Sequence, residues 1–397
     1  MASRVRRLGA AAVGVALTGA TAGIGATVAG PAAVAFVERR RSRVHQRGPY
    51  RASPRAEELH RSLTVVDLHA DSLFWGRDLL RRSRRGHADV PRLIAGNVAL
   101  TAMAVATKVP RRVNLARNDD TTDDVTLLAM AGRWPRATWH SPLARALHHA
   151  ARLRAMAADS AGRLTVIETR AGLDAYLARR ATDPDITAAF LAIEGAQALE
   201  DDLANLEILA AAGYRMLSPT HFVDTFVAGS AHGLVQGGLT EAGRELLSQM
   251  EWSGLIVDVA HASSATIDDV LSIATRPVVA SHTGVRAAVP GVRNLPDDQV
   301  RGIAATGGVV GIGFWPVACG GEDAASIARS IATAVDLAGA EHVGLGSDFD
   351  GAVPTPFDAS GLVQLTDALL ATGLGDAEVA AVMGGNALRV IRAGLPA

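Results

Sequence analysis

Residues 64–71 read TVVDLHAD, a short β-branched run that ends in a histidine and an aspartate. Side chains alternate along a strand, so His69 and Asp71 point to the same side. Seven more apolar runs follow, separated by stretches with helical periodicity. They cover residues 98–106, 188–193, 214–218, 255–259, 277–280, 309–313 and 343–346. Eight strands alternating with helices predict an α/β fold, a (β/α)8 barrel of the TIM type.

The connecting segments carry their own helix signals. Leucines at 199, 203, 206 and 209 recur every three or four positions, and Gly213 follows as a stop. Thr240 is placed to cap a helix that carries Leu246, Leu247 and Met250 on one side. Residues 114–185 are too many for one crossover and predict extra helices.

Composition limits the class of protein. The 397 residues are 49% hydrophobic and 20% charged, which indicates a sizeable buried core. The net charge of −1 argues against a nucleic-acid binder, whose surface would be basic. The single cysteine, Cys319, rules out an intrachain disulfide and a zinc site built on thiolates. Any metal site must therefore use histidines and carboxylates.

The N-terminus differs from the rest of the chain. Residues 8–37 carry no charge and lie between basic clusters, at 4–7 and 39–43. Thirty such residues can span a hydrocarbon core, which needs about 20. A membrane anchor is the favoured prediction, and an exported protein cut near Ala33-Val34-Ala35 is the alternative. We expect residues 1–61 to form this anchor or signal segment plus a basic tether, and residues 62–397 to form the barrel domain.

Polar residues stand just beyond six of the eight predicted strands. Barrel enzymes place their chemistry at this C-terminal edge. The residues are His69, Asp71, Glu194, His221, His261, His282 and Asp348. Each alone could be a packed polar side chain, but their joint position on one rim indicates a metal site.

The kinds of residue suggest two divalent ions. Imidazole and carboxylate suit Zn²⁺, and also Mn²⁺, Fe²⁺ or Co²⁺. Five ligands, His69, Asp71, Glu194, His261 and His282, fit a pair of ions that share one carboxylate. Glu194 is the natural bridge because its two oxygens can each reach an ion. Two ions about 3.5–4 Å apart can share a hydroxide and polarise a carbonyl group.

Between Val65 and Arg389, the sequence resembles the membrane dipeptidase (renal dipeptidase) family of zinc metallopeptidases. The resemblance rests on motifs that are specific in combination. They stand at residues 67–71, 87–93, 192–195, 218–222, 238–245, 258–263, 281–283, 293–297 and 344–351. The family fold is a (β/α)8 barrel, in agreement with the strand count.

The resemblance implies a role for each matched residue. His69 and Asp71 would bind one zinc ion, His261 and His282 the other, and Glu194 both. His221 would contact the substrate carbonyl and stabilise the oxyanion, and Arg293 would pair with the substrate carboxylate. Asp348 would carry the proton from the bridging hydroxide or water to the leaving amine.

Other interpretations stay open for several residues. Arg293 could form a surface salt bridge, and Asp348 could orient a ligating histidine. We expect structural roles for Asp350 and His87. His148 and His149 lie in an Ala-rich helical stretch and are expected to face solvent.

Together these features predict a binuclear zinc hydrolase that cleaves dipeptides. The alternatives are a metal-dependent amidohydrolase acting on another small amide or lactone, and a non-catalytic relative. Departures from the family pattern, Ala196-Gln197 and the loop 223–233 after His221, leave the substrate open. The resemblance also suggests a homodimer.

Overall fold

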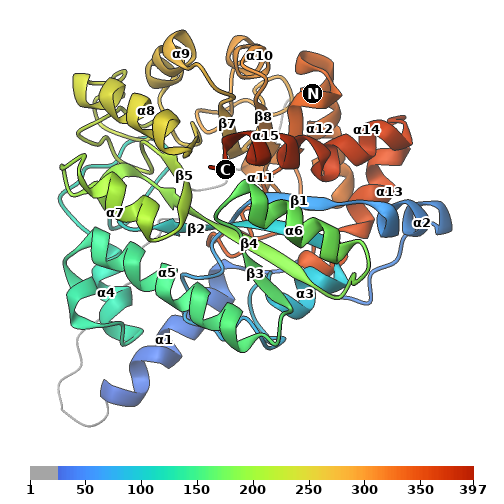
Figure 1. Ribbon diagram of the computed structural model, residues 1–397, viewed down its shortest axis with the longest axis horizontal. Coiled ribbons are helices and arrows are strands. Elements are labelled where there is room, and N and C mark those ends of the chain that lie inside the picture. Colours follow the sequence, from blue (N-terminus) through green and yellow to red (C-terminus); the bar gives the residue numbers. More distant parts are fainter. Residues whose placement is uncertain (1–25) are drawn as a thin grey trace, which may run out of the picture.

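Eight parallel strands form the centre of the molecule in the computed structural model, which describes residues 26–397. Their order is β6-β5-β4-β2-β1-β9-β8-β7. The ends of this sheet meet where the Val259 amide donates to the Val279 carbonyl at 2.7 Å. Helices surround the strands (Figure 1). The strands are β1 Val65–Ala70, β2 Val98–Ala106, β4 Thr187–Glu194, β5 Tyr214–Ser218, β6 Ile256–Val257, β7 Val279–Thr283, β8 Val309–Ile312 and β9 Val343–Leu345.

The predicted barrel and its eight strands are confirmed. One further strand, β3 (Leu164–Val166), was not predicted, because it lies inside the segment 114–185, where only extra helices were expected. It pairs with the first half of β4, whose second half pairs with β5. All nine residues of β2 and all eight of β4 are buried, as strands covered on both faces must be.

The helices lie between successive strands and on the outside of the sheet. Thr240 caps α8 as predicted, its Oγ1 accepting from the Gly243 amide at 3.1 Å. Three helices, α4, α5 and α6, occupy the long crossover after β2. The helices are α3 Val90–Ala95, α4 Asp124–Ala131, α5 Pro142–Asp159, α6 Arg170–Arg180, α7 Asn205–Ala211, α8 Glu241–Ser253, α9 Ser264–Ile273, α10 Asp297–Ala305, α11 Pro316–Cys319, α12 Ala324–Ala338, α13 Val363–Ala371, α14 Asp376–Ala380 and α15 Asn386–Gly394.

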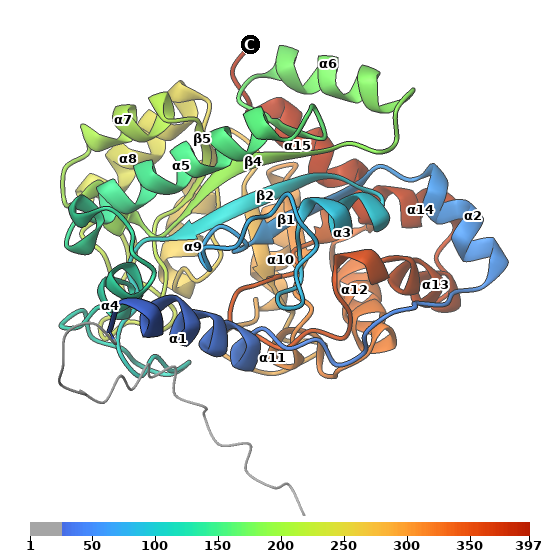
Figure 2. The same cartoon turned by 90° about the horizontal axis from the view of Figure 1, so that it is seen from below.

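A helix near the N-terminus, α1 (Ala26–Arg41), lies alongside α4 (Figure 2). Its Val34 is buried in an apolar cluster with Trp75, Leu128 and Trp134. The two helices approach so closely that a Cβ added to Gly30 would lie 2.5 Å from the Ala131 carbonyl oxygen of α4. The contact is therefore a packed interface.

Charged residues fix the other end of α1. Glu38 is fully buried and pairs with Arg77 at 2.5 Å and with Arg85. Arg77 also pairs with the buried Asp350. The helix thus carries one carboxylate of a buried four-member ion network.

The predicted tether, residues 39–61, packs against the barrel. The His45 amide donates to the Thr355 carbonyl at 2.9 Å, and helix α2 (Pro54–Ser62) packs against α13. Residues 39–61 therefore lie on the barrel, and a domain boundary at Ser62 stays a prediction. The predicted anchor at 8–37 lies partly outside the described residues. Between residues 26 and 397, no helix has the length and apolarity that crossing a membrane requires.

Candidate metal centre

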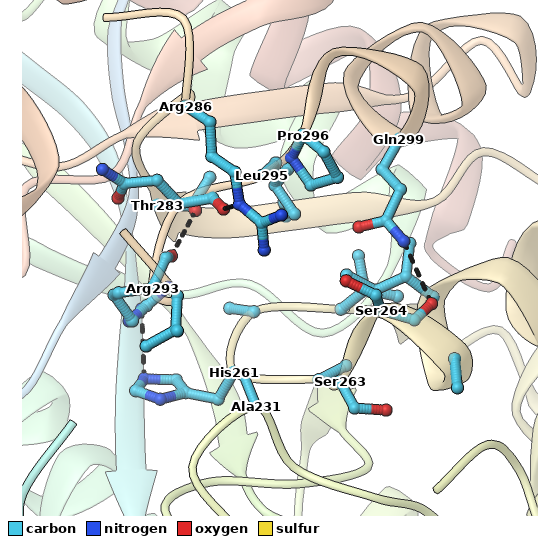
Figure 3. Close-up of a pocket in the computed structure, with 18 of the residues that line it drawn as sticks. Ala231, His261, Ser263, Ser264, Thr283, Arg286, Arg293, Leu295, Pro296 and Gln299 are labelled. Carbon is cyan, nitrogen blue, oxygen red and sulfur yellow. Dashed lines mark hydrogen bonds between the residues drawn. The ribbon is translucent and has the colours of Figure 1, made fainter. Parts of the chain in front are cut away.

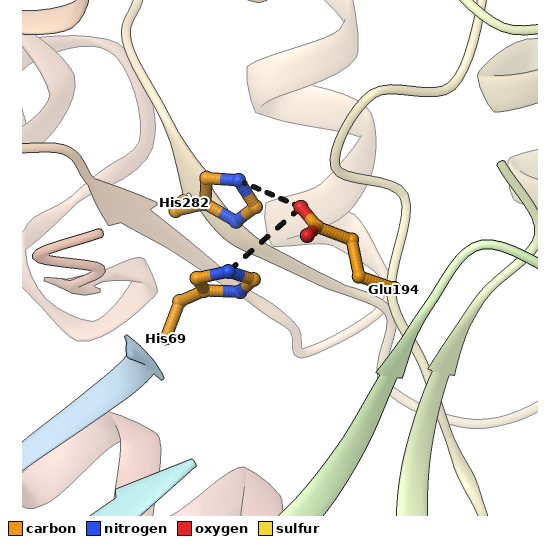
Figure 4. A group of neighbouring side chains, drawn as sticks. All are labelled: His69, Glu194 and His282. Atoms are coloured by element: carbon orange, nitrogen blue, oxygen red, sulfur yellow. Dashed lines mark ion pairs between the residues drawn. The ribbon is translucent and has the colours of Figure 1, made fainter. Parts of the chain in front are cut away.

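The strand-end residues predicted from the sequence come together at one buried point. Three groups of side chains each bring their ligand atoms within 4.8 Å of one another. They are His69 with Glu194 and His282, Glu194 with His221 and His261, and His69 with Asp71 and Asp348. All seven side chains are buried. Figure 4 shows the rings of His69 and His282 directed at the Glu194 carboxylate.

Glu194 is the centre of this arrangement. Its Oε1 lies 3.1 Å from His261 Nε2, 3.3 Å from His282 Nε2 and 3.8 Å from His69 Nε2. Its Oε2 lies 3.5 Å from His221 Nε2. Three ring nitrogens thus face one oxygen of this carboxylate and His221 faces the other, while the bridging role of Glu194 stays a prediction.

Asp71 and Asp348 complete the side of the site that His69 occupies. Asp71 Oδ2 lies 3.3 Å from His69 Nε2. Asp348 follows β9, and its amide donates to the His69 carbonyl at 3.2 Å. Asp348 and His261 both hold left-handed backbone, with φ of 59° and 64°. Such conformations cost about 1–3 kcal/mol and occur preferentially at functional sites.

The electrostatics of the cluster favour a bound cation. Burial raises the pKa of Glu194 to about 8, and burial together with the charge of Asp71 raises the pKa of Asp348 well above its ordinary value. Burial would lower the pKa of His69, but the charges of Glu194 and Asp71 raise it to about 10. Three carboxylates therefore compete for positive charge in a dry site, which divalent ions would supply.

The remaining histidines are in the form that metals bind. Burial lowers the pKa values of His221, His261 and His282 well below the ordinary range, so their rings are neutral at pH 7. Neutral imidazole offers one ring nitrogen as a ligand. The residues present thus fit a pair of divalent ions.

Asp258 and Ser281 orient His282. Asp258 Oδ1 accepts from the Ser281 and Ala260 amides at 2.8 and 3.0 Å, and its Oδ2 accepts from the Ser281 hydroxyl at 2.6 Å. The Ser281 oxygen lies 2.9 Å from His282 Nδ1. Since that hydroxyl donates to the carboxylate, its oxygen accepts from Nδ1–H, which leaves the lone pair on Nε2 for a metal.

Asp67 holds the other side of the site in a similar way. It accepts from the Ser347 hydroxyl at 2.6 Å, from the Ser347 amide at 2.9 Å and from the His69 amide at 3.3 Å. The end of β1 is thereby tied to the loop that carries Asp348. Asp67 and Asp258 lie inside the sequence motifs at 67–71 and 258–263, but the motifs alone predict no role for either. A carboxylate within a run of buried strand residues was the available signal.

Arg293 lies inside the site. It is 6% exposed, and its Nη2 lies 3.1 Å from His261 Nε2 and donates to the His282 carbonyl at 2.8 Å. Its guanidinium carbon stands 5.4 Å from the Trp315 ring centroid. The alternative of a surface salt bridge is therefore wrong.

Two expected structural residues prove to be so, and two expected surface residues do not. Asp350 accepts from the Ser72 hydroxyl at 2.6 Å, and its amide donates to His87 Nδ1 at 2.9 Å. Both support the loop of Asp348. His149 is 1% exposed and stands 4.6 Å from the Trp134 ring centroid, and His148 is partly buried. The expectation of solvent exposure is wrong for His149 and only partly right for His148, because both rings face Trp134 in the segment after α4.

Comparison with known proteins settles the family. The sequence profile of the membrane dipeptidase family (Peptidase family M19) matches residues 53–394. The chain belongs to the membrane dipeptidase family. That family consists of metallodipeptidases, so the cluster at the strand ends of the barrel is the candidate site of a metal-dependent hydrolase.

Several dipeptidase relatives are similar to the chain. Dipeptidase aclJ of Aspergillus oryzae is 35% identical over 218 residues, which are 52% of each protein. A metallopeptidase of Rhodobacter sphaeroides, solved with a phosphinate mimic of the dipeptide L-Ala-D-Ala, is 26% identical, with a TM-score of 0.68 over 83% of this chain and 99% of that one. The probable dipeptidase PvdM of Pseudomonas aeruginosa shares the fold at 21% identity, with a TM-score of 0.71 over 86% of this chain and 99% of that one.

Proposed function

We propose that this member of the family is a binuclear zinc dipeptidase. The observation that supports the proposal best is the position of Glu194, whose two oxygens face the ring nitrogens of four histidines at 3.1–3.8 Å. A carboxylate so placed, with Asp71 and Asp348 close by, is suited to share two divalent ions.

The five predicted ligands would divide into two sets around this carboxylate. His69 and Asp71 would hold one ion, and His261 and His282 the other, with Glu194 shared. Bound zinc ions would supply an activated water, the hydroxide expected as nucleophile, and would polarise the substrate carbonyl. The chain's own part is to keep neutral imidazoles in place and to exclude bulk water from the buried site.

Three further residues would handle the substrate. His221 is neutral and buried next to Glu194, where it can donate to the oxyanion that develops on the substrate carbonyl. Arg293 would take the free carboxylate, and its burial strengthens that pairing. Asp348, whose pKa burial raises, would accept the proton from the attacking water and pass it to the leaving amine.

The bound mimic in the Rhodobacter protein supports a dipeptide as the substrate here. A second candidate, hydrolysis of another small amide or a lactone, is favoured by the loop 223–233 after His221, which departs from the family pattern noted in the sequence. A non-catalytic relative is the third candidate. All five ligands are present and meet, which counts against it.

A panel of L,L and L,D dipeptides tests the proposal. The chain is loaded with zinc and assayed before and after a chelator, and its metal content is measured. We expect about two ions per chain and turnover that disappears with the metal. Turnover of an acylated amino acid or a lactone, with none of any dipeptide, would select the second candidate. Metal below one ion per chain after loading would contradict the binuclear site.

Location and assembly are separate proposals. Anchoring through residues 8–37 or export is tested by fractionating cells that express the full chain. A homodimer is tested by the mass of the purified protein in solution.

A further inference from the structure

A cavity of about 180 Å³ opens beside the metal centre. Its walls come from the loop after β6 and the loop after β7, and His261 and Arg293 belong to both the cavity and the metal centre. A substrate whose carboxylate pairs with Arg293 would therefore place the neighbouring side chain at this cavity.

Arg286 points into the cavity from the β7 loop. Its Nε donates to the carbonyls of Asn294 at 2.9 Å and Gly291 at 3.2 Å, which fixes the plane of the guanidinium. Its two terminal nitrogens contact no acceptor among residues 26–397, and no acidic side chain there pairs with it. Figure 3 shows this guanidinium directed toward the middle of the cavity, between Arg293 and Gln299.

The lining is positively charged. It contains Arg286 and Arg293, and none of its residues is an aspartate or a glutamate. The first residues of α9, Ser264 and Ala265, also line it and add the positive end of a helix. Such a surface favours an anionic group.

One feature favours a hydrogen-bond donor instead. Gln299 is 2% exposed, and its Nε2 donates to the Ser264 carbonyl at 3.0 Å and to Asp268 at 2.8 Å. Its Oε1 is the remaining acceptor on this wall of the cavity, and it has no partner in the described chain. A neutral carboxamide could hydrogen-bond to both Arg286 and Gln299. A carboxylate would pair with Arg286 and would also offset the positive charge of the lining.

We propose that Arg286 is a specificity-determining residue that selects dipeptides with an acidic second residue. The proposal rests on the dipeptidase function proposed above, with Arg293 on the main-chain carboxylate and Arg286 on the side-chain carboxylate. The charge of Arg286 decides for the acid over the amide, because a guanidinium with no acidic partner in the described chain attracts an anion more strongly than a dipole.

The test compares matched substrates. Ala-Asp is measured against Ala-Asn, and Ala-Glu against Ala-Gln, each with an L or a D second residue. We expect kcat/KM to favour the acid about tenfold in at least one pair, and Arg286→Gln to bring that ratio near one. The substitution changes the loop in the same way for both substrates of a pair. The ratio of their kcat/KM values therefore reports the effect of the charge alone. Arg286→Lys should keep a preference for the acid.

Arg301→Gln, which removes an exposed arginine of α10 outside the cavity, serves as the control and should keep the parent ratio. A parent that cleaves Ala-Ala but shows no preference for the acid, or prefers the amide, would overturn the inference. So would Arg286→Gln with the parent ratio. If the zinc-loaded parent cleaves no dipeptide at all, the proposed function itself fails, and the inference falls with it.

Discussion

Replacing Asp258 by asparagine should weaken metal binding by reversing a chain of hydrogen bonds. The two backbone amides of Ser281 and Ala260 donate to Asp258 Oδ1, so the asparagine must place its oxygen there. Its NH₂ group then faces the Ser281 hydroxyl, which in the parent donates to Oδ2 at 2.6 Å. The hydroxyl then donates to a ring nitrogen instead, either His282 Nδ1 at 2.9 Å or His69 Nδ1 at 3.4 Å. Donation to the nearer ring, His282, moves its imidazole proton to Nε2, the nitrogen that faces Glu194 at 3.3 Å.

The size of the effect follows from the lost lone pair. A histidine with its proton on the ligating nitrogen must change tautomer before it binds a metal. Removing partners of this kind typically costs 10–100-fold in metal affinity, or about 1.4–2.7 kcal/mol. Ser281→Ala removes the hydroxyl from this series of hydrogen bonds without reversing their direction. His282 can then adopt either tautomer. We therefore expect a smaller loss, below about tenfold.

Zinc affinity is measured by competition with a chromophoric chelator at pH 7, and the tautomer of His282 by ¹⁵N NMR of the imidazole nitrogens. Asp174→Asn, which breaks an exposed ion pair with Arg392, is the control and should bind zinc as the parent does. An affinity of Asp258→Asn within about threefold of the parent would refute the reasoning. A larger loss in Ser281→Ala than in Asp258→Asn would refute it as well.

Three further perturbations test the site and the stability of the fold. Glu194→Gln should leave about one ion per chain or fewer by elemental analysis, because it weakens the shared ligand, and zinc retained at two per chain would contradict the bridge. Asp348→Asn should lower kcat by about 10²–10⁴ with metal content unchanged, and metal loss would make Asp348 a ligand. Burial lowers the pKa of His148 from 6.5 to about 4 and that of His149 well below 6.5, so the neutral rings stabilise the fold above pH 6.5. The free energy of unfolding should therefore fall as the pH drops from 6.5 toward 4, and His149→Leu should reduce that slope in urea titrations.

The fold could be predicted because its strands lie in largely apolar runs that alternate with helices. All eight predicted runs contain barrel strands, since strands covered on both faces are mostly apolar. The short β3 and the docking of α1 could not be predicted. Strand β3 lies inside the long segment 114–185, where only helices were expected, and the uncharged part of α1, which ends at Val37, would have the same pattern in a membrane as on α4. The burial of Glu38 distinguishes the two, and its partner Arg77 is distant in the sequence.

Within the site, the cluster of strand-end residues could be predicted, and the residues that support it could not. Chain position after a strand identifies residues such as His69 and Glu194, because parallel strands all end at one rim. The roles of Asp258 and Asp67 depend on which hydroxyl each carboxylate faces across neighbouring strands, which spacing does not encode. Arg286 was missed for the same reason. Its free nitrogens are evident only once the loop after β7 has folded back on itself.

The packing of α1 limits how freely the N-terminus can be exchanged among relatives. The family profile begins at residue 53, beyond this helix, yet Val34 and Glu38 lie in the interior. An N-terminal segment grafted from another barrel would have to match the close approach at Gly30 and present a carboxylate to Arg77 and Arg85. A truncation after Arg41 would instead uncover Trp75 and Trp134, and it would leave Arg85 without its carboxylate partner. Helix α1 is therefore packed specifically against this barrel, and the N-terminal segment of a relative could not simply replace it.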